Sequence, residues 1–211
     1  MTLHVWLAFV AASAIVLLIP GPTVLLVVGD ALANGSQRAW ATVAGVGLGD
    51  ATAMALSLAG AGALLRASAV AFTVMKMLGG SYLIYLGAKS IINARRGVAK
   101  VNGKMALRST TAPATRFGKA YAITVSNPKS ILFFVAFAPQ FISPQTAVWA
   151  QSGALLATFT CLSILNSSMY SLLAWLVGDR VVGFSAQRKI SYAGGCTLIG
   201  AGALSLAMKQ N

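Results

Sequence analysis

Two long stretches of the chain carry no charged side chain, and they constrain its fold more than any other feature. The first lies between His4 and Asp30, and the second lies between Lys129 and Asp179. A bilayer core about 30 Å thick is crossed by a helix of about 20 apolar residues, so each stretch is long enough to span a membrane. The second stretch is too long for one helix, and the prolines that bound residues 139–144 mark the expected turn.

The composition excludes the main alternatives to a membrane protein. Of the 211 residues, 57% are apolar and 9% are charged, and the mean hydropathy is +0.78. Soluble domains carry about 25% charged residues, and disordered chains need low hydrophobicity. The two cysteines, Cys161 and Cys196, lie in apolar stretches without CxxC or metal-ligand spacing, which argues against a disulfide scaffold. Because the alternating pattern of a transmembrane barrel is also missing from the sequence, we expect an all-α polytopic membrane protein.

Charges and helix breakers divide the chain into six expected transmembrane helices within a single membrane domain, residues 1–211. One extended polar connection, about residues 89–119, follows the third span. The expected spans run approximately over residues 3–28, 39–65, 71–86, 118–137, 147–177 and 190–208.

The basic residues lie where they would orient the helices. The chain has 16 Lys and Arg against 3 Asp and Glu, which gives a net charge of +13. Twelve of the sixteen fall between spans 1 and 2, 3 and 4, or 5 and 6, and eight of these lie in residues 89–119. Cytoplasmic loops carry the excess of Lys and Arg, so the 89–119 loop is expected in the cytoplasm and both termini outside. The charge thus indicates a lipid bilayer as partner and no nucleic acid.

A weak internal repeat relates the two halves of the chain, about residues 3–92 and 118–208. Residues 78–88 and 193–203 share six identical positions at an offset of 115, and the helix breakers of spans 1 and 4 lie about 106 residues apart. Chance identity is the alternative, because Gly, Ala and Leu dominate any membrane helix. Two three-helix units must be inverted relative to each other, and inverted repeats with broken helices 1 and 4 are typical of secondary transporters.

The helix breaks are the first candidate site. A proline removes a backbone donor, and in lipid the freed carbonyls are tolerated only in the protein interior or beside a water-filled cavity. Half-helix N-termini with a lysine nearby favour an anionic group such as a carboxylate. A packed kink, and snorkelling of the lysine to the membrane interface, are the alternatives. The break residues are Pro20, Gly21 and Pro22 in the first span and Asn127, Pro128 and Lys129 in the fourth.

Asp50 is the one acidic residue inside an expected span. A membrane carboxylate pairs with a lysine such as Lys129, binds a substrate ammonium or takes up a proton. The chain has no Glu, and His4 lies at the terminus, so Asp50 is the expected proton carrier. Asn166 and Ser167 in the fifth span either line the same cavity or bond between helices.

Enzyme and metal signatures are weak. No second histidine is present for a Ser/His pair, no His/Cys/Glu cluster is suited to a metal, and a Ser–Lys dyad has no support beyond residue type. The glycines of residues 45–49 do not follow a strand, so they are no dinucleotide fingerprint. We therefore expect no cofactor, no metal and no catalytic residue.

Several motifs between residues 20 and 141 are specific enough to suggest a family. They are P-G-P at 20–22, G-S-Q-R-A at 35–39, G-x-x-x-G-D at 45–50, G-G-S-Y-L-I-Y-L-G at 79–87 and N-P-K-S-I-L-F-F-V-A-F-A-P-Q-F at 127–141. Together they resemble the LysE/RhtB family of amino-acid exporters, the homoserine, threonine and lysine efflux type. The last two spans carry little that is diagnostic.

The resemblance implies export of amino acids or close derivatives across the bacterial inner membrane, in exchange for protons. The wider superfamily also exports other solutes and cations, although Asp50 and two cysteines are few ligands for a cation. A non-transporting membrane protein that docks lipids or a subunit through its basic loop is a further alternative, and the small-residue helix faces are compatible with a homo-oligomer. The residues to which the resemblance assigns roles are Pro20, Gly21, Pro22, Asp50, Asn127, Pro128 and Lys129.

Overall fold

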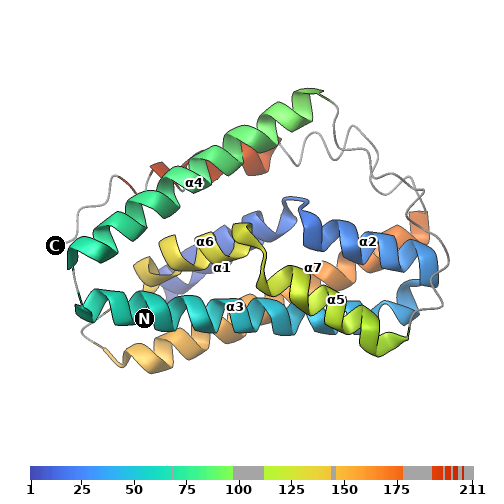
Figure 1. Ribbon diagram of the computed structural model, residues 1–211, viewed down its shortest axis with the longest axis horizontal. Helices are drawn as coiled ribbons and strands as arrows, with labels where there is room; N and C mark the ends of the chain where they lie inside the picture. Colours follow the sequence, from blue (N-terminus) through green and yellow to red (C-terminus); the bar gives the residue numbers. More distant parts are fainter. Residues whose placement is uncertain are drawn as a thin grey trace.

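The described part of the chain is helical throughout (Figure 1). The computed structural model describes residues 1–67, 69–96, 112–143 and 146–177, and in the last segment residues 192–196, 198–200, 202–203 and 206. The all-α prediction is confirmed for these residues. The elements are α1 (Leu3–Leu18), α2 (Pro22–Asn34), the 3₁₀ turn η1 (Ser36–Arg38), α3 (Trp40–Ala67), α4 (Ala69–Arg96), α5 (Pro113–Val125), α6 (Pro128–Ala136), the 3₁₀ turn η3 (Ala138–Phe141) and α7 (Val148–Val177).

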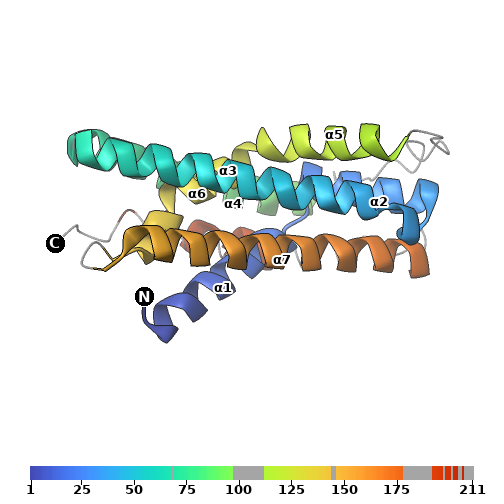
Figure 2. The ribbon, with the colours of Figure 1, turned by 90° about the horizontal axis from the view of Figure 1, so that it is seen from below.

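Two long helices, α3 and α7, lie side by side along the length of the molecule (Figure 2). Their apolar segments Trp40–Gly60 and Val148–Leu176 are each long enough to cross a membrane. The bounds of α7 agree with the expected fifth span to within one residue, and α3 agrees with the second span to within two.

The expected first and fourth spans are both broken helices. The axes of α1 and α2 differ by 60°, and the axis of α5 differs by 47° from that of the segment Pro128–Phe141. In Figure 1, α5 covers the half of α3 that is closer to α2, while α6 lies along the other half. The second broken helix therefore follows α3 along most of its length.

The third span and the loop after it differ from the sequence prediction. Helix α4 runs to Arg96, about ten residues beyond the expected end at position 86, and α5 begins at Pro113. Both ends of the predicted 89–119 loop are therefore helical, and residues 97–111 lie outside the described residues. Lys and Arg are good helix formers, and proline is favoured at a helix start, so a polar composition there did not imply a loop.

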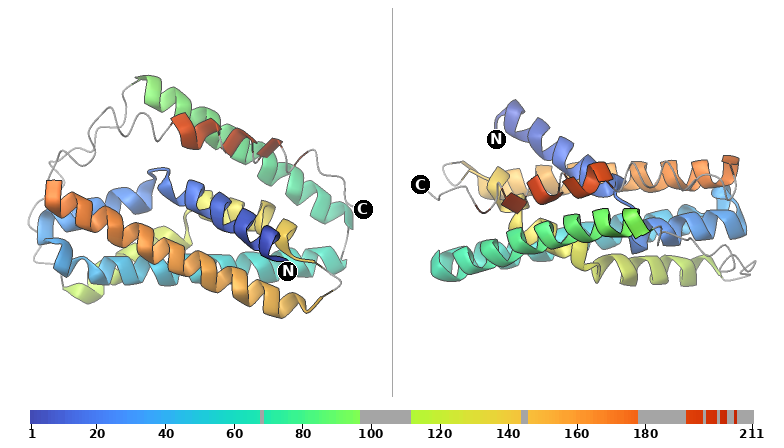
Figure 3. Two further views of the ribbon diagram at one scale, coloured as in Figure 1. Left: turned by 180° about the vertical axis from the view of Figure 1, so that it is seen from behind. Right: turned by 90° about the horizontal axis from the view of Figure 1, so that it is seen from above.

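The six-span count and the inverted repeat remain predictions. Besides α3, α7 and the two bent pairs, the described chain has a shorter apolar helical segment, Met77–Ile92, within α4. The described residues of the predicted sixth span are helical and lie along α4 (Figure 3). The packing there is close, because a Cβ added to Gly80 would lie 3.1 Å from the carbonyl oxygen of Gly202.

Exposed side chains mark the surface that would face lipid. Helix α7, for example, exposes Ile164, Leu165, Leu172 and several other large apolar side chains. Trp149 is 81% exposed and Trp175 is 56% exposed, and they lie near opposite ends of α7. Their separation of 26 residues corresponds to about 39 Å of helix, close to the thickness of a bilayer with its interfaces. Tryptophans at both interfaces are typical of membrane proteins.

Candidate functional site

The site begins with two backbone carbonyls that have lost their helical donors. In a continuous helix the N–H of residue 20 would bond to the carbonyl of Val16, and that of residue 22 would bond to the carbonyl of Leu18. Both positions are proline and have no N–H, so the helix cannot satisfy these carbonyls. Helix α1 accordingly ends at Leu18, and α2 begins at Pro22, a position where proline is favoured.

Side chains from α6 and α7 replace the missing donors. Four consecutive carbonyl oxygens at the end of α1 each accept a side-chain hydrogen bond. This arrangement fixes the end of α1 to two other helices, in place of the intrahelical bonds that the prolines remove. Lys129 Nζ donates to Val16 O at 2.8 Å and to Ile19 O at 2.9 Å, Asn166 Nδ2 donates to Leu17 O at 3.2 Å, and Tyr170 Oη donates to Leu18 O at 2.9 Å.

Asn127 joins the second helix break to the first. Its side-chain oxygen caps α6 by accepting from the backbone N–H of Lys129 at 3.1 Å, and its Nδ2 donates to Thr23 Oγ1 on α2 at 3.3 Å. The starts of α2 and α6 thus lie next to each other. Both ends carry partial positive charge, and both leave backbone N–H groups without a partner inside the helix.

Asp50 lies in the middle of α3 and is 2% exposed. Ser163 of α7 donates to its Oδ2 at 2.5 Å. The Ser130 side chain of α6 also interacts with the carboxylate, whereas Oδ1 accepts no hydrogen bond of normal length from the described residues. The Lys129 ammonium acts on the Asp50 carboxylate electrostatically, but the two groups are not in direct contact. Within the described ranges, the oppositely charged pair that comes within 4.0 Å is Arg116–Asp30.

Apolar layers close the bundle on both sides of Asp50. One turn before it on α3, Val46 belongs to a buried cluster, and one turn after it, Met54 belongs to another. Asp50 therefore lies in a buried polar layer between two apolar ones. The first cluster includes Val27, Val43, Val46 and Ala120, and the second includes Phe9, Met54, Phe133, Phe134, Leu155 and Phe159.

The other predicted residues lie close to this layer. A Cβ added to Gly21 would lie 3.7 Å from Lys129 Nζ, so the break in α1 approaches the lysine. Ser167 is 4% exposed on α7, one turn after Ser163. Asn166 bonds to the end of α1, which favours the bonding alternative for this residue over cavity lining alone.

Two residues of α7 in the site, Ser163 and Tyr170, were not expected from the sequence. Ser163 precedes Asn166 by about one helical turn on α7, and Tyr170 follows it by about one turn. The face that carries Asn166 therefore also carries these two hydroxyls. That spacing was a usable signal, but hydroxyl residues are frequent in membrane helices. Only the packing of α7 against α1 and α3 distinguishes them from the exposed Ser168.

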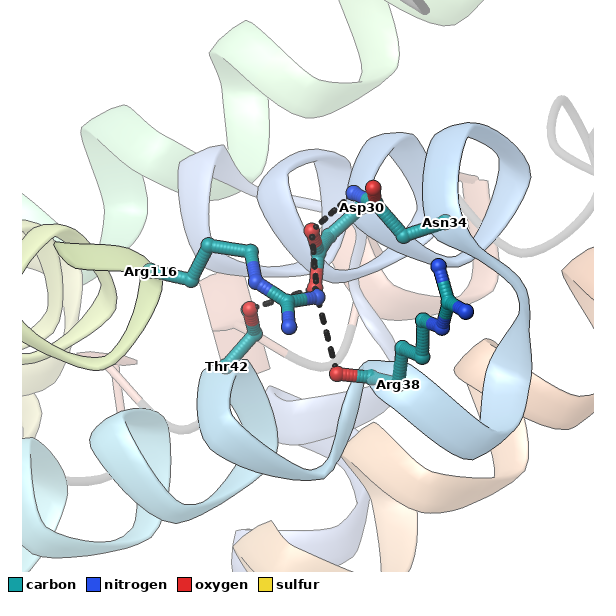
Figure 4. Close-up of polar contacts among 5 residues, drawn as sticks. All are labelled: Asp30, Asn34, Arg38, Thr42 and Arg116. Carbon is teal, nitrogen blue, oxygen red and sulfur yellow. Dashed lines mark hydrogen bonds and ion pairs between the residues drawn. The ribbon is translucent and has the colours of Figure 1, made fainter. Parts of the chain in front are cut away.

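A second polar cluster lies at the far end of α2 (Figure 4). Asp30 accepts from Asn34 Nδ2 at 2.8 Å, from Thr42 Oγ1 at 2.6 Å and from Arg116 Nη1 at 3.4 Å. The same Arg116 nitrogen donates to the Arg38 carbonyl at 2.8 Å. The prediction that Arg116 is a residue of the basic loop is wrong, because it lies on α5 and its side chain is 10% exposed.

The described residues contain no group of three His, Cys, Asp or Glu side chains suited to a metal ion. Cys161 and Cys196 are both exposed. The hydrogen bonds of Lys129 Nζ go to backbone carbonyls, as given above, and not to a serine hydroxyl.

The described residues form helices throughout, two of the apolar segments are bent at a break, and this arrangement is that of a polytopic membrane protein. The family described as LysE type translocator matches residues 14–209. The chain belongs to the LysE family, whose members are transporters and not enzymes.

Curated relatives agree with this assignment. An uncharacterized membrane protein of Vibrio cholerae is 30% identical over 99% of this chain and 100% of its own length. An uncharacterized membrane protein of Pseudomonas aeruginosa is 32% identical over 92% of this chain and 88% of its own length. A leucine efflux protein of Salmonella typhimurium is 35% identical over 69% of this chain and 68% of its own length. No solved structure matches the chain.

Proposed function

We propose that the chain exports neutral, apolar amino acids or close derivatives from the cytoplasm across the bacterial inner membrane, in exchange for protons. The basic segment around residues 89–119 then faces the cytoplasm, and both termini face outward, as the distribution of Lys and Arg predicts. The observation that carries the proposal is the Asp50 carboxylate, which is buried and has one oxygen that accepts no hydrogen bond of normal length from the described residues.

The two ends of an amino acid fit the two parts of the site. The substrate ammonium would bind Oδ1 of Asp50. The substrate carboxylate would bind near the adjoining starts of α2 and α6, where the helix dipoles and free N–H groups favour an anion. Lys129 contributes positive charge at the same place.

The neighbouring apolar layer supports an apolar substrate side chain. Met54 and Phe159 lie one helical turn from Asp50 and Ser163 respectively, and both are buried. The relative from Salmonella typhimurium is named a leucine efflux protein, which agrees with this chemistry. A lysine-type substrate would bring a second ammonium for which the layer offers no acidic partner among the described residues.

Coupling to protons would use the same carboxylate. Protonation of Asp50 from outside would release the substrate ammonium, and loss of the proton to the cytoplasm would restore the site. Substrate and proton then exclude each other at one group, which is the simplest route to exchange.

Counterflow in proteoliposomes tests the proposal, with labelled leucine, threonine, homoserine and lysine at two pH values. We expect leucine to be taken up best. Asp50→Asn removes a charge-assisted hydrogen bond worth about 1.5–3 kcal/mol, so affinity falls about 10- to 150-fold and the pH dependence disappears. Cys161→Ser, on the exposed face of α7, is the control. Full transport with intact pH coupling in Asp50→Asn would exclude Asp50 from the mechanism.

A further inference from the structure

The end of α1 has the chemistry of a cation site. Two of its carbonyl oxygens, those of Val16 and Ile19, accept from the same Lys129 ammonium at the negative end of the α1 dipole, while the two between them accept from side chains of α7. In secondary transporters with broken helices, carbonyls at the C-terminal ends of half-helices coordinate the coupling Na⁺. Here an ammonium group lies where such an ion would bind.

The position of Lys129 on its own helix explains why its side chain reaches this place. Lys129 is the second residue of α6, close to the positive end of that helix, and a lysine there is unfavourable. Its ammonium lies instead at the negative end of α1, 2.8 and 2.9 Å from the carbonyl oxygens of Val16 and Ile19. The interaction thus removes one unfavourable charge–dipole contact and forms a favourable one.

Asp50 adds the negative charge that a bound cation needs. It interacts electrostatically with the Lys129 ammonium without a direct ion pair. Removal of the ammonium would leave the Val16 and Ile19 carbonyls without a donor and Asp50 without a nearby positive charge. A small cation that entered the same place would restore both.

We infer that the end of α1 is a binding site for a small monovalent cation, which the Lys129 ammonium fills as a tethered ion. The wild-type chain therefore needs no bound Na⁺ or K⁺, and truncation of Lys129 opens the site to a free cation. This inference concerns the end of α1, Lys129 of α6 and Asp50 of α3, and does not depend on which substrate is transported.

Thermal unfolding of the purified protein without substrate tests the inference, because the readout is independent of transport. Lys129→Ala is titrated with Na⁺, K⁺ or methylammonium, with choline replacing the ion at constant ionic strength. We expect saturable binding, with the unfolding midpoint rising by about 3–5 °C for each tenfold increase in cation above its Kd. Wild-type protein should show no such difference between ions.

Two matched variants separate a cation site from a general salt effect. Lys129→Met fills the same space without charge and should respond to none of the ions. Lys119→Ala, which removes an exposed lysine of α5, should behave as wild type. Equal responses of Lys129→Ala to choline and to the small ions, or equal responses of the Ala and Met variants, would overturn the inference.

Two further results would also count against it. A Lys129→Ala protein that aggregates equally in all four media contradicts the inference, because a cation in the vacated site should restore folding. Wild-type counterflow that requires Na⁺ or K⁺ contradicts it as well, because the site would then not be filled already. If the wild-type protein transports none of the labelled amino acids while Lys129→Ala responds to small cations, the proposed function is wrong and the cation site is supported.

Discussion

At the scale of single residues, two prolines account for much of the site. Pro20 and Pro22 deprive the carbonyls of Val16 and Leu18 of their helical donors, and the side chains of Lys129 and Tyr170 replace them. An unsatisfied carbonyl inside a membrane protein is costly. The prolines and the replacement donors therefore depend on one another, although they lie far apart in the sequence.

Tyr170→Phe tests this dependence, since it removes one hydroxyl and little else. The carbonyl of Leu18 loses its donor, and we expect a loss of about 0.6–1.7 kcal/mol, between the average and the maximum measured for interhelical hydrogen bonds in membranes. The unfolding midpoint should fall by about 1–7 °C. Tyr85→Phe, which alters an exposed tyrosine of α4, should leave it unchanged, and equal midpoints for the two variants would refute the role of the Tyr170 hydroxyl.

Ser163→Ala tests the hydroxyl of α7 that donates a hydrogen bond to Asp50. Its hydroxyl donates to Asp50 Oδ2 at 2.5 Å, and a hydrogen bond to a charged group is worth about 1.5–3 kcal/mol. We expect slower counterflow with an altered pH dependence, whereas Ser168→Ala on the exposed face of α7 should transport normally. A Ser163→Ala variant with the wild-type pH profile would show that Ser163 does not act on Asp50 in transport.

At the scale of helices, glycines set the distance between α3 and α5. A Cβ added to Gly49 would lie 2.8 Å from the Cβ of Thr124 and 3.1 Å from the carbonyl oxygen of Tyr121. Small residues at membrane helix contacts allow backbones to approach in this way. Because α6 continues from α5, this contact also positions Asn127 and Lys129 beside the end of α1.

Gly49→Ala should therefore destabilise the protein, while Gly60→Ala on the same helix should not. Overpacking of this kind costs about 1–3 kcal/mol. A Cβ on Gly60 meets no atom within 4 Å, and alanine is the better helix former by about 1 kcal/mol. Unfolding midpoints of the two variants measure the difference, and a Gly49→Ala protein as stable as Gly60→Ala would contradict this account of the α3–α5 contact.

At the scale of the whole molecule, Arg116 and Asp30 join the two halves of the chain. The pair connects α5 to α2, and Thr42 and the Arg38 carbonyl extend it to α3 and η1 (Figure 4). All of these groups lie at one end of the bundle, the end predicted to be cytoplasmic. Any movement of the second half relative to the first must accommodate this cluster.

A double-mutant cycle with Asp30→Asn and Arg116→Gln measures the strength of that connection. Each single change leaves one largely buried charge without its partner, so we expect a coupling free energy of about 0.5–3 kcal/mol from unfolding measurements. The double variant should be less destabilised than the sum of the single ones. Arg95→Gln, on an exposed position of α4, is the control, and strictly additive effects would show that the pair stabilises nothing.

The predicted inverted repeat gains support from the contacts between α4 and the described residues near the C-terminus. Gly80 approaches Gly202, and Gly87 approaches Gly195. In the sequence alignment of the two halves, Gly80 corresponds to Gly195 and Gly87 to Gly202, so the contacts are reciprocal. Reciprocal contacts are expected around a two-fold axis, but the six-span repeat stays a prediction.

The sequence by itself determined the membrane class, the two helix breaks and the candidate residues of those breaks. A long uncharged stretch favours insertion into lipid, and a proline removes a backbone N–H, so both signals act on the segment that carries them. Two of the family motifs contain the same prolines. The bounds of α7 and the starts of α2 and α6 could be predicted for this reason.

Only the tertiary structure decided which groups meet. The sequence left open whether Lys129 pairs with Asp50, reaches the interface or binds a carboxylate, whereas the fold directs its ammonium to the end of α1. The fold also buries Arg116 against Asp30, although the sequence predicted that Arg116 lies in the cytoplasmic loop. These outcomes depend on which helices pack together, and contacts between residues 86 to 113 positions apart leave no periodic signal in a single sequence.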